Sequence, residues 1–233
     1  MDYSSLVTSL ATLTAIDETD ANFLLMVPDA IDYAEARIYR ELNLLATGVR
    51  DGTGSLAAAS RNFTLPTPSG GGTWLVVESA NVITPASTAP DSGTRVPLLK
   101  TTQQFIDLIG ASPTGADVPS AFAMVTTDTL IVGPVPAGAY RLEIVGTVQP
   151  AALSATNTTT ILTDEFPALF EVACMIFLAG YMQNYGAQAD DPRQAQSWET
   201  QYQTLKASSE TEEARKRVTA FSGRSVAGTP RAA

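Results

Sequence analysis

The chain has 233 residues, enough for one good hydrophobic core or for a core with a smaller satellite layer. It carries 14 basic and 24 acidic side chains, with a net charge of −10 and no histidine. This balance excludes broad binding to nucleic-acid phosphates, which needs an excess of lysine and arginine, although an acidic wall still lets DNA pass nearby without sticking.

The first block of the chain, residues 1–50, shows helical periodicity. Leu6, Leu10 and Leu13 recur at helical spacing and predict a short amphipathic helix. Residues 17–20 then break the pattern, and their carboxylates can cap the helix that follows.

That second helix is predicted from an apolar stripe at spacings of three and four, formed by Phe23, Val27, Ile31, Ala34, Ile38, Leu42 and Leu45. Pro28 falls inside the stripe, and proline suits the first turn of a helix but damages its interior. We therefore expect a short turn before Pro28 and a long helix after it, ended by Gly48 and Gly52. The opposite face is predicted to be a solvated surface that carries Asp32, Glu35, Arg37, Arg40 and Glu41.

The middle block, residues 60–153, changes to glycine, proline, threonine and short β-rich runs. Candidate strands cover residues 61–65, 74–78 and 95–99. A short helix is predicted at residues 102–109, where Phe105, Ile106 and Ile109 share a face.

The clearest strand pair in this block joins residues 121–126 to residues 129–132 through a two-residue turn. Residues 140–148 form a further predicted strand, in which apolar side chains alternate with Arg141 and Glu143 as in a half-buried strand. Together these elements predict one small antiparallel sheet.

The third block, residues 164–206, is helical again. Asp164 can cap a helix that begins near Pro167. Residues 168–181 are apolar almost all round, so this helix should lie at the centre of a bundle, and Gly186 ends it.

The last predicted helix begins at Asp191-Pro192 and carries an apolar stripe of Ala195, Trp198, Tyr202 and Leu205. Beyond Lys206 the pattern is polar on every side through Arg217, so a helix there needs a partner or frays. Residues 222–233 are rich in glycine, serine and alanine and predict a flexible tail.

These blocks predict an α+β fold that is mainly α: a helical bundle of about four helices, an inserted small antiparallel β domain and an extended C-terminal segment. We expect the N-terminal helices of the bundle in residues 1–50 and the inserted β block in residues 60–153. The C-terminal helices are expected in residues 164–206, and an extended or flexible tail in residues 207–233.

The sequence shows no membrane span or export signal. Residues 172–182 form the longest apolar run, which is too short to cross a bilayer, and residues 1–4 lack the basic start of a secretory signal. We expect a cytosolic chain in which the single Cys174, inside that run, is a buried and unreactive thiol.

No motif for a catalytic, cofactor or metal site stands out. Histidine-dependent triads and zinc sites are excluded, and one cysteine cannot make a cysteine-only zinc site. Lys100-Thr101 resembles the end of a phosphate loop but lacks the required glycines before it. We therefore expect a protein that is not an enzyme and uses no cofactor.

Paired carboxylates stay open as a catalytic pattern, since a glycosidase needs only two of them in a cleft. The candidates are Asp128, Asp164, Glu165, Glu171, Asp190 and Asp191. We favour turn and capping roles for Asp128, Asp164 and Asp191. For Glu171 we favour a pairing with an arginine in the core or at a subunit contact. Trp198 and Tyr202 could stack on a ligand, but packing is the commoner use of that spacing.

Several segments in order resemble the tailed-phage head-to-tail (portal) adaptor protein family. Residues 23–28, followed by the pattern P-x-x-I-x-x-A-E-x-R-I-x-R-E-L over residues 28–42, resemble its N-terminal signature. Residues 132–136, 140–154 and 166–171 resemble later elements of the family, as do Trp198 and Tyr202. The resemblance extends from about Ser4 to Lys206, and the middle block departs from it most.

The resemblance implies a structural virion protein at the neck, assembled in the host cytoplasm. It implies a ring of identical subunits, commonly twelve, that docks beneath the portal and surrounds a channel through which DNA passes. The bundle would form the ring, and the β block would face outward or toward downstream tail or nozzle proteins. The C-terminal segment would reach an acidic portal surface and order on binding it, using Arg215, Lys216, Arg217, Arg224 and Arg231.

Three alternatives remain open from the sequence. The chain could be another neck or tail-completion protein of the stopper kind, which would bind the tail without the portal. It could be a carboxylate-based cell-wall hydrolase. The C-terminal segment could also be a disordered terminus without a partner.

Overall fold

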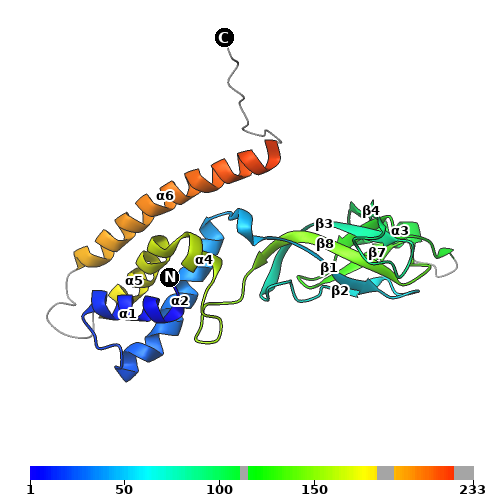
Figure 1. The fold of residues 1–233 in the computed structure, drawn as a ribbon. Helices are drawn as coiled ribbons and strands as arrows, with labels where there is room; N and C mark the ends of the chain where they lie inside the picture. The colour runs from blue at the N-terminus through cyan, green and yellow to red at the C-terminus, as the bar shows by residue number, and fades with distance from the viewer. Residues whose placement is uncertain (111–114, 183–191, 223–233) are drawn as a thin grey trace, which may run out of the picture. The chain divides into compact units, whose positions relative to one another are not determined.

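The computed structural model describes residues 1–110, 115–182 and 192–222 (Figure 1). Helices and antiparallel strands both occur, so the predicted α+β fold class is confirmed. The chain divides into two compact units. The helical unit comprises residues 1–45 together with the chain from residue 152 onward, and the β unit comprises residues 46–151.

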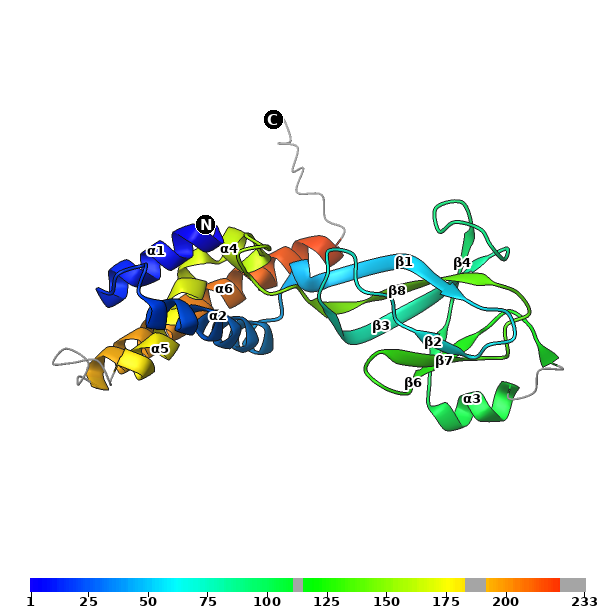
Figure 2. The ribbon, with the colours of Figure 1, turned by 90° about the horizontal axis from the view of Figure 1, so that it is seen from below.

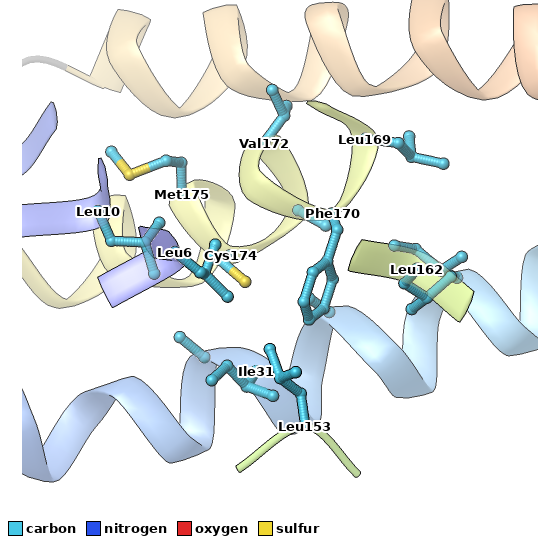
Figure 3. Packing of buried hydrophobic residues seen from close by; sticks show 14 of the residues in the cluster. Leu6, Leu10, Ile31, Leu153, Leu162, Leu169, Phe170, Val172, Cys174 and Met175 are labelled. Carbon is cyan, nitrogen blue, oxygen red and sulfur yellow. The ribbon is translucent and has the colours of Figure 1, made fainter. Parts of the chain in front are cut away.

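The helical unit is organised around one apolar helix. Its helices are α1 (Tyr3–Thr14), α2 (Ala21–Glu41), α4 (Ile161–Glu165), α5 (Pro167–Met182) and α6 (Pro192–Ser222). Helix α5 packs against the other four, as its apolar character predicted. Figure 3 shows Leu6 of α1 and Ile31 of α2 lying against Cys174 and Phe170 of α5. Burial raises the pKa of the Cys174 thiol, in keeping with an inert side chain.

Helix α1 confirms the predicted amphipathic segment only in part. Leu6 and Leu10 are fully buried, whereas Leu13 is 45% exposed. Asp20 caps α2 as expected, because its carboxylate accepts hydrogen bonds from the backbone N–H groups of Asn22 and Phe23, both at 2.9 Å.

The prediction of a break at Pro28 was wrong, because α2 continues through it from Ala21 to Glu41. Pro28 lies on the exposed face of the helix, as does Leu24, whose carbonyl loses its helical partner there. Val27 and Ile31, on the other face, stay in the core. Burial of the apolar stripe therefore offsets the cost of the proline.

Two predicted helix starts have different outcomes. Pro167 and Pro192 do begin α5 and α6. Asp164 does not cap a helix, because it lies inside the short helix α4. The N-cap of α4 is Thr160, whose backbone N–H donates to the Thr163 hydroxyl at 2.8 Å. Gly186 and Asp191 lie outside the described residues.

The described residues of the β unit form two four-stranded sheets where the sequence predicted one. Sheet I has the order β1-β8-β3-β4 (Figure 2). Sheet II has the order β2-β7-β6-β5, with β5 and β6 parallel. The strands are β1 (Gly48–Leu56), β2 (Asn62–Thr64), β3 (Thr73–Thr84), β4 (Thr94–Pro97), β5 (Leu99–Lys100), β6 (Ala121–Met124), β7 (Thr129–Gly133) and β8 (Tyr140–Gln149). The β6–β7 hairpin and strand β8 confirm the sequence prediction.

Gly48 begins strand β1 and does not end a helix, because α2 already ends at Glu41. The strand is held by antiparallel pairing with β8 from Gly48↔Thr147 to Leu56↔Tyr140. Its own sequence is polar and rich in glycine, so tertiary pairing overrides weak local strand propensity.

The core of the β unit lies between its two sheets. Leu142 and Ile144 of sheet I belong to the same buried cluster as Phe122 and Leu130 of sheet II. Helix α3 (Gln103–Gly110) confirms the predicted short helix and covers the other face of sheet II through Ile106. Ile106 is fully buried there, while Phe105 and Ile109 remain 40% and 39% exposed.

Candidate interaction surfaces

Arg37 joins helix α2 to helix α6 within the helical unit. Its guanidinium donates to both carboxylate oxygens of Glu199, at 2.9 and 2.6 Å, and to Glu41 at 3.0 Å. The same group lies 4.1 Å from the ring centroid of the fully buried Tyr202. The hydrogen bonds to Glu199 raise the pKa of Arg37, so this guanidinium stays charged at every accessible pH.

A second ion pair continues this contact along α6. Lys206 lies 2.9 Å from Glu41, and the Tyr202 hydroxyl donates to the same carboxylate at 3.2 Å. Burial opposes ionisation of Glu41, but the hydrogen bonds from Lys206 and Arg37 hold its pKa below the ordinary value. We call Arg37, Glu41, Glu199, Tyr202 and Lys206 the α2–α6 clamp.

The predicted solvated face of α2 is confirmed for Asp32 and Arg40, which are exposed, and was wrong for Arg37 and Glu41, which contact α6. A purely polar helix face looks the same whether water or a polar partner helix covers it. The partner here is α6, whose Trp198, Tyr202 and Leu205 also pack into the apolar core, which confirms the predicted stripe at these three positions. The side chain of Ala195, its fourth member, lies outside the described residues. Tyr202 is fully buried, so it is not free to stack on a ligand.

Glu35 is a further residue of that face that the sequence misplaced. Its side chain is almost completely buried, and its carboxylate accepts the backbone N–H of Leu153 at 3.0 Å. Burial raises the pKa of Glu35 to about 7, with a smaller contribution from the negative charge of Asp32. This hydrogen bond fixes the chain where it returns from the β unit to the helical unit.

The end of α6 is fastened by a second group of charges. Lys216 lies 2.7 Å from Glu165, 2.8 Å from Glu213 and 3.2 Å from Glu212. The buried Glu213 also accepts the backbone N–H of Leu45 at 2.7 Å. These carboxylates, Glu165 first, raise the pKa of Lys216. We call Glu165, Glu212, Glu213 and Lys216 the α6 anchor.

The prediction of an extended or flexible tail from residue 207 onward was wrong up to Ser222, because α6 continues to that residue. Of the predicted portal-contact residues, Lys216 is engaged in the anchor, and Arg217 donates to the Asn43 backbone carbonyl at 2.8 Å. Arg215 is exposed beside a shallow depression that Glu212 and Thr219 also line. Arg224 and Arg231 lie outside the described residues.

The β unit holds a charged cluster that crosses all four strands of sheet I. The carboxylate of Glu143 on β8 accepts from Arg50 of β1 at 2.7 Å, Asn81 of β3 at 3.0 Å and Arg95 of β4 at 3.1 Å. The Glu143 side chain is only 3% exposed, so its predicted solvated position was wrong. Burial opposes its ionisation, but Arg50, Asn81 and Arg95 hold its pKa below the ordinary value.

The carboxylates considered as catalytic candidates have separate structural roles where the structure describes them. Asp128 accepts from the Thr126 hydroxyl at 2.5 Å in the β6–β7 turn, and Glu165 belongs to the α6 anchor. Asp164 is exposed on α4. Glu171 accepts the hydroxyl hydrogen bond of Ser9 from α1, and no arginine side chain that the structure describes pairs with it. Asp190 and Asp191 lie outside the described residues.

The comparison with protein families decides the family. The model of the SU10 adaptor protein family matches residues 1–226. The chain belongs to this family. SU10 adaptors are phage adaptor proteins, so the resemblance drawn from the sequence is confirmed. A comparison with curated proteins gave no match.

Membership in the SU10 adaptor family covers both units of the chain, since the match begins at residue 1 and ends beyond α6. The β unit is therefore part of the adaptor itself. The signature segment of α2 supplies Glu35, Arg37 and Glu41, whose roles are to fix Leu153 and α6. Within the described residues, no helix is long and apolar enough to cross a membrane.

Proposed function

We propose that this chain is a structural virion protein that joins the portal of a phage head to the tail. In this proposal identical copies, twelve of them, form a ring at the neck and surround the channel through which DNA passes. The family match over residues 1–226 carries the proposal. The net charge of −10 supports it, because an acidic channel protein lets DNA pass without retaining it.

The helical unit, as a bundle of about four helices, would form the ring. The β unit would face outward or toward downstream tail or nozzle proteins. Assembly would take place in the host cytoplasm, and neither a membrane nor a cofactor would take part. A ring built this way uses head-to-tail contacts between identical copies.

The end of α6 supports a portal-binding role for the segment that follows it. The α6 anchor holds the helix through Lys216, so Lys216 and Arg217 are already engaged within their own chain. The exposed Arg215, with Arg224 and Arg231 beyond the helix, is then left to meet an acidic portal surface. The anchor would present that segment from a fixed base.

The proposal is tested by light scattering after size exclusion, with the chain alone and mixed with its portal. We expect a defined ring on the portal, and we expect deletion of residues 222–233 to weaken that complex. The triple change Arg215→Glu, Arg224→Glu and Arg231→Glu should weaken it as well, while Arg40→Glu on the exposed face of α2 should not. A chain that ignores the portal would refute the adaptor function, and an unaffected deletion would refute the role of the segment.

A second candidate is a stopper-like neck or tail-completion protein. The two four-stranded sheets favour it, because the β unit holds more strand than the sequence indicated. Such a protein would bind the tail in the absence of the portal. The remote candidate, a carboxylate-based cell-wall hydrolase, predicts a cleared band on a zymogram of host cell walls.

A further inference from the structure

The outer face of sheet I gathers three of the five basic side chains of the β unit. Arg50, Arg95 and Arg141 lie on the face of Glu143, because Arg141 is two residues from it on β8 and the other two bond to it. Helix α3 covers sheet II, and among the described elements no helix of the β unit covers this face. The arginines are therefore a surface feature, although the chain as a whole is acidic.

Glu143 positions the arginines without using up their donors. A guanidinium carries five N–H groups. Arg50 donates to Glu143 through Nη2 and keeps a side chain that is 55% exposed. Arg95 donates through Nε, and its Nη2 lies 3.8 Å from the fully exposed Asp91. An approaching carboxylate can thus accept from guanidiniums that are already held in place, which lowers the entropy cost of binding.

A complementary surface exists in the helical unit of the same chain. Residues 1–36 contain seven acidic side chains and neither lysine nor arginine. On α2, Leu25, Asp29 and Asp32 share one exposed face at spacings of four and three, and Leu25 is 73% exposed. Neither Asp29 nor Asp32 makes an ion pair with another residue in the part of the chain that the structure describes. Their carboxylates are available to a partner.

We propose that sheet I of one copy binds the exposed face of α2 that carries Leu25, Asp29 and Asp32 on a second copy. Asp29 and Asp32 would face Arg50 and Arg95. The exposed Val76 on the same face of sheet I supplies apolar surface for Leu25. The two surfaces differ, so the contact is heterologous and repeats from copy to copy until a ring closes. The inference rests on the proposed ring of helical units, in which this contact would join the β unit of each copy to the helical unit of its neighbour.

The test uses two full-length variants, each with one altered surface. The sheet variant carries Arg50→Gln, Arg95→Gln and Glu143→Gln, which removes the arginine charges without leaving a buried carboxylate unpaired. The α2 variant carries Asp29→Lys and Asp32→Lys at exposed positions. The matched control carries Arg61→Gln and Asp107→Asn, which removes an ion pair on the other side of the β unit. Circular dichroism checks that each variant folds.

Association is measured by sedimentation velocity over a dilution series, with and without the portal. We expect each variant alone to associate about tenfold more weakly than the wild type, and rising salt to weaken the wild type. A mixture of the two variants should recover pairs, because it contains one intact copy of each surface. The control should behave like the wild type.

Variants that assemble like the wild type, alone and on the portal, would overturn the inference and leave the adaptor function standing. A wild-type chain that stays monomeric alone and binds the portal only as single copies would also overturn it. Binding of duplex DNA that needs Arg50 and Arg95 would assign this face to nucleic acid instead. A chain that never binds the portal would refute the proposed function separately.

Discussion

The helical unit and the β unit each bury a glutamate, and the pKa values of these two glutamates shift in opposite directions. Glu35 is 3% exposed, and its carboxylate accepts one backbone hydrogen bond, from the N–H of Leu153. The effect of burial exceeds that of this hydrogen bond, so the pKa of Glu35 rises to about 7. Glu143 is 2% exposed but faces two guanidiniums and an amide, and its pKa falls below the ordinary value. Burial and the hydrogen-bonding partners together set the ionisation of a buried carboxylate.

The same contrast runs through the architecture of the two units. The helical unit depends on an apolar helix, α5, surrounded by amphipathic ones, with the α2–α6 clamp at the edge. The β unit places its apolar core between two sheets and organises the outer face of one sheet around Glu143. Polar groups thus join helices in one unit and order a surface in the other.

The largest expected effect separates the stabilities of the two units. Phe170→Ala should destabilise the helical unit by about 3–5 kcal/mol, because removing this fully buried ring leaves a cavity in the core. Phe122→Ala is the matched change in the β unit, where the ring is also fully buried. Chemical denaturation, with hydrogen exchange measured for each unit, should show that the loss of stability from each substitution is confined to its own unit. Equal loss in both units would mean that they unfold as one.

A smaller effect is expected from the α2–α6 clamp. Arg37→Ala removes charged hydrogen bonds to Glu199 and Glu41 and should cost about 1.5–3 kcal/mol. Hydrogen exchange in α6 should accelerate, while that of the β unit should not change. Arg40→Ala, on an exposed position of the same helix, is the control and should have little effect. Unchanged protection of α6 would contradict the clamp.

The remaining effects concern pH, and their signs are opposite in the two units. Because the pKa of Glu35 is raised to about 7, its favourable contribution is present below about 4.5 and is lost as the pH rises through 7. Glu35→Gln should therefore flatten the pH dependence of the helical unit across that range. Denaturation midpoints measured from acidic to mildly basic pH provide the check.

The pKa of Glu143 is lowered, so its contribution is present above about 4.5 and is lost as the pH falls through the lower folded value. Glu143→Gln should remove this acid sensitivity from the β unit and leave the helical unit unchanged. If both glutamine variants shifted stability in the same direction with pH, the contrast between the two sites would be wrong.

The sequence predicted well those elements whose pattern depends on local spacing. Helix α5 was expected from its apolar run, and the β6–β7 hairpin from two β-rich runs at turn distance. Strand β1 was missed because its residues are polar and glycine-rich, and only its pairing with β8 makes it a strand. The second sheet was missed for the same reason, since short strands acquire a sheet only from partners distant in sequence.

The candidate surfaces were harder to predict than the elements. Glu35 and Glu143 each fit a polar face by periodicity, and the residues that bury them come from far along the chain. Arg37 and Glu41 belong to a signature segment, which pointed to the family but not to their contact with α6. The identity of a polar partner is not encoded in the spacing of one helix.

Electron cryomicroscopy of the full-length chain mixed with its portal tests the central claim most directly. The adaptor account predicts a closed ring of copies beneath the portal, with the segment after α6 in contact with it and an open channel along the axis. Portal particles with no added ring, beside free copies of this chain, would contradict the account and favour a neck protein that binds the tail alone.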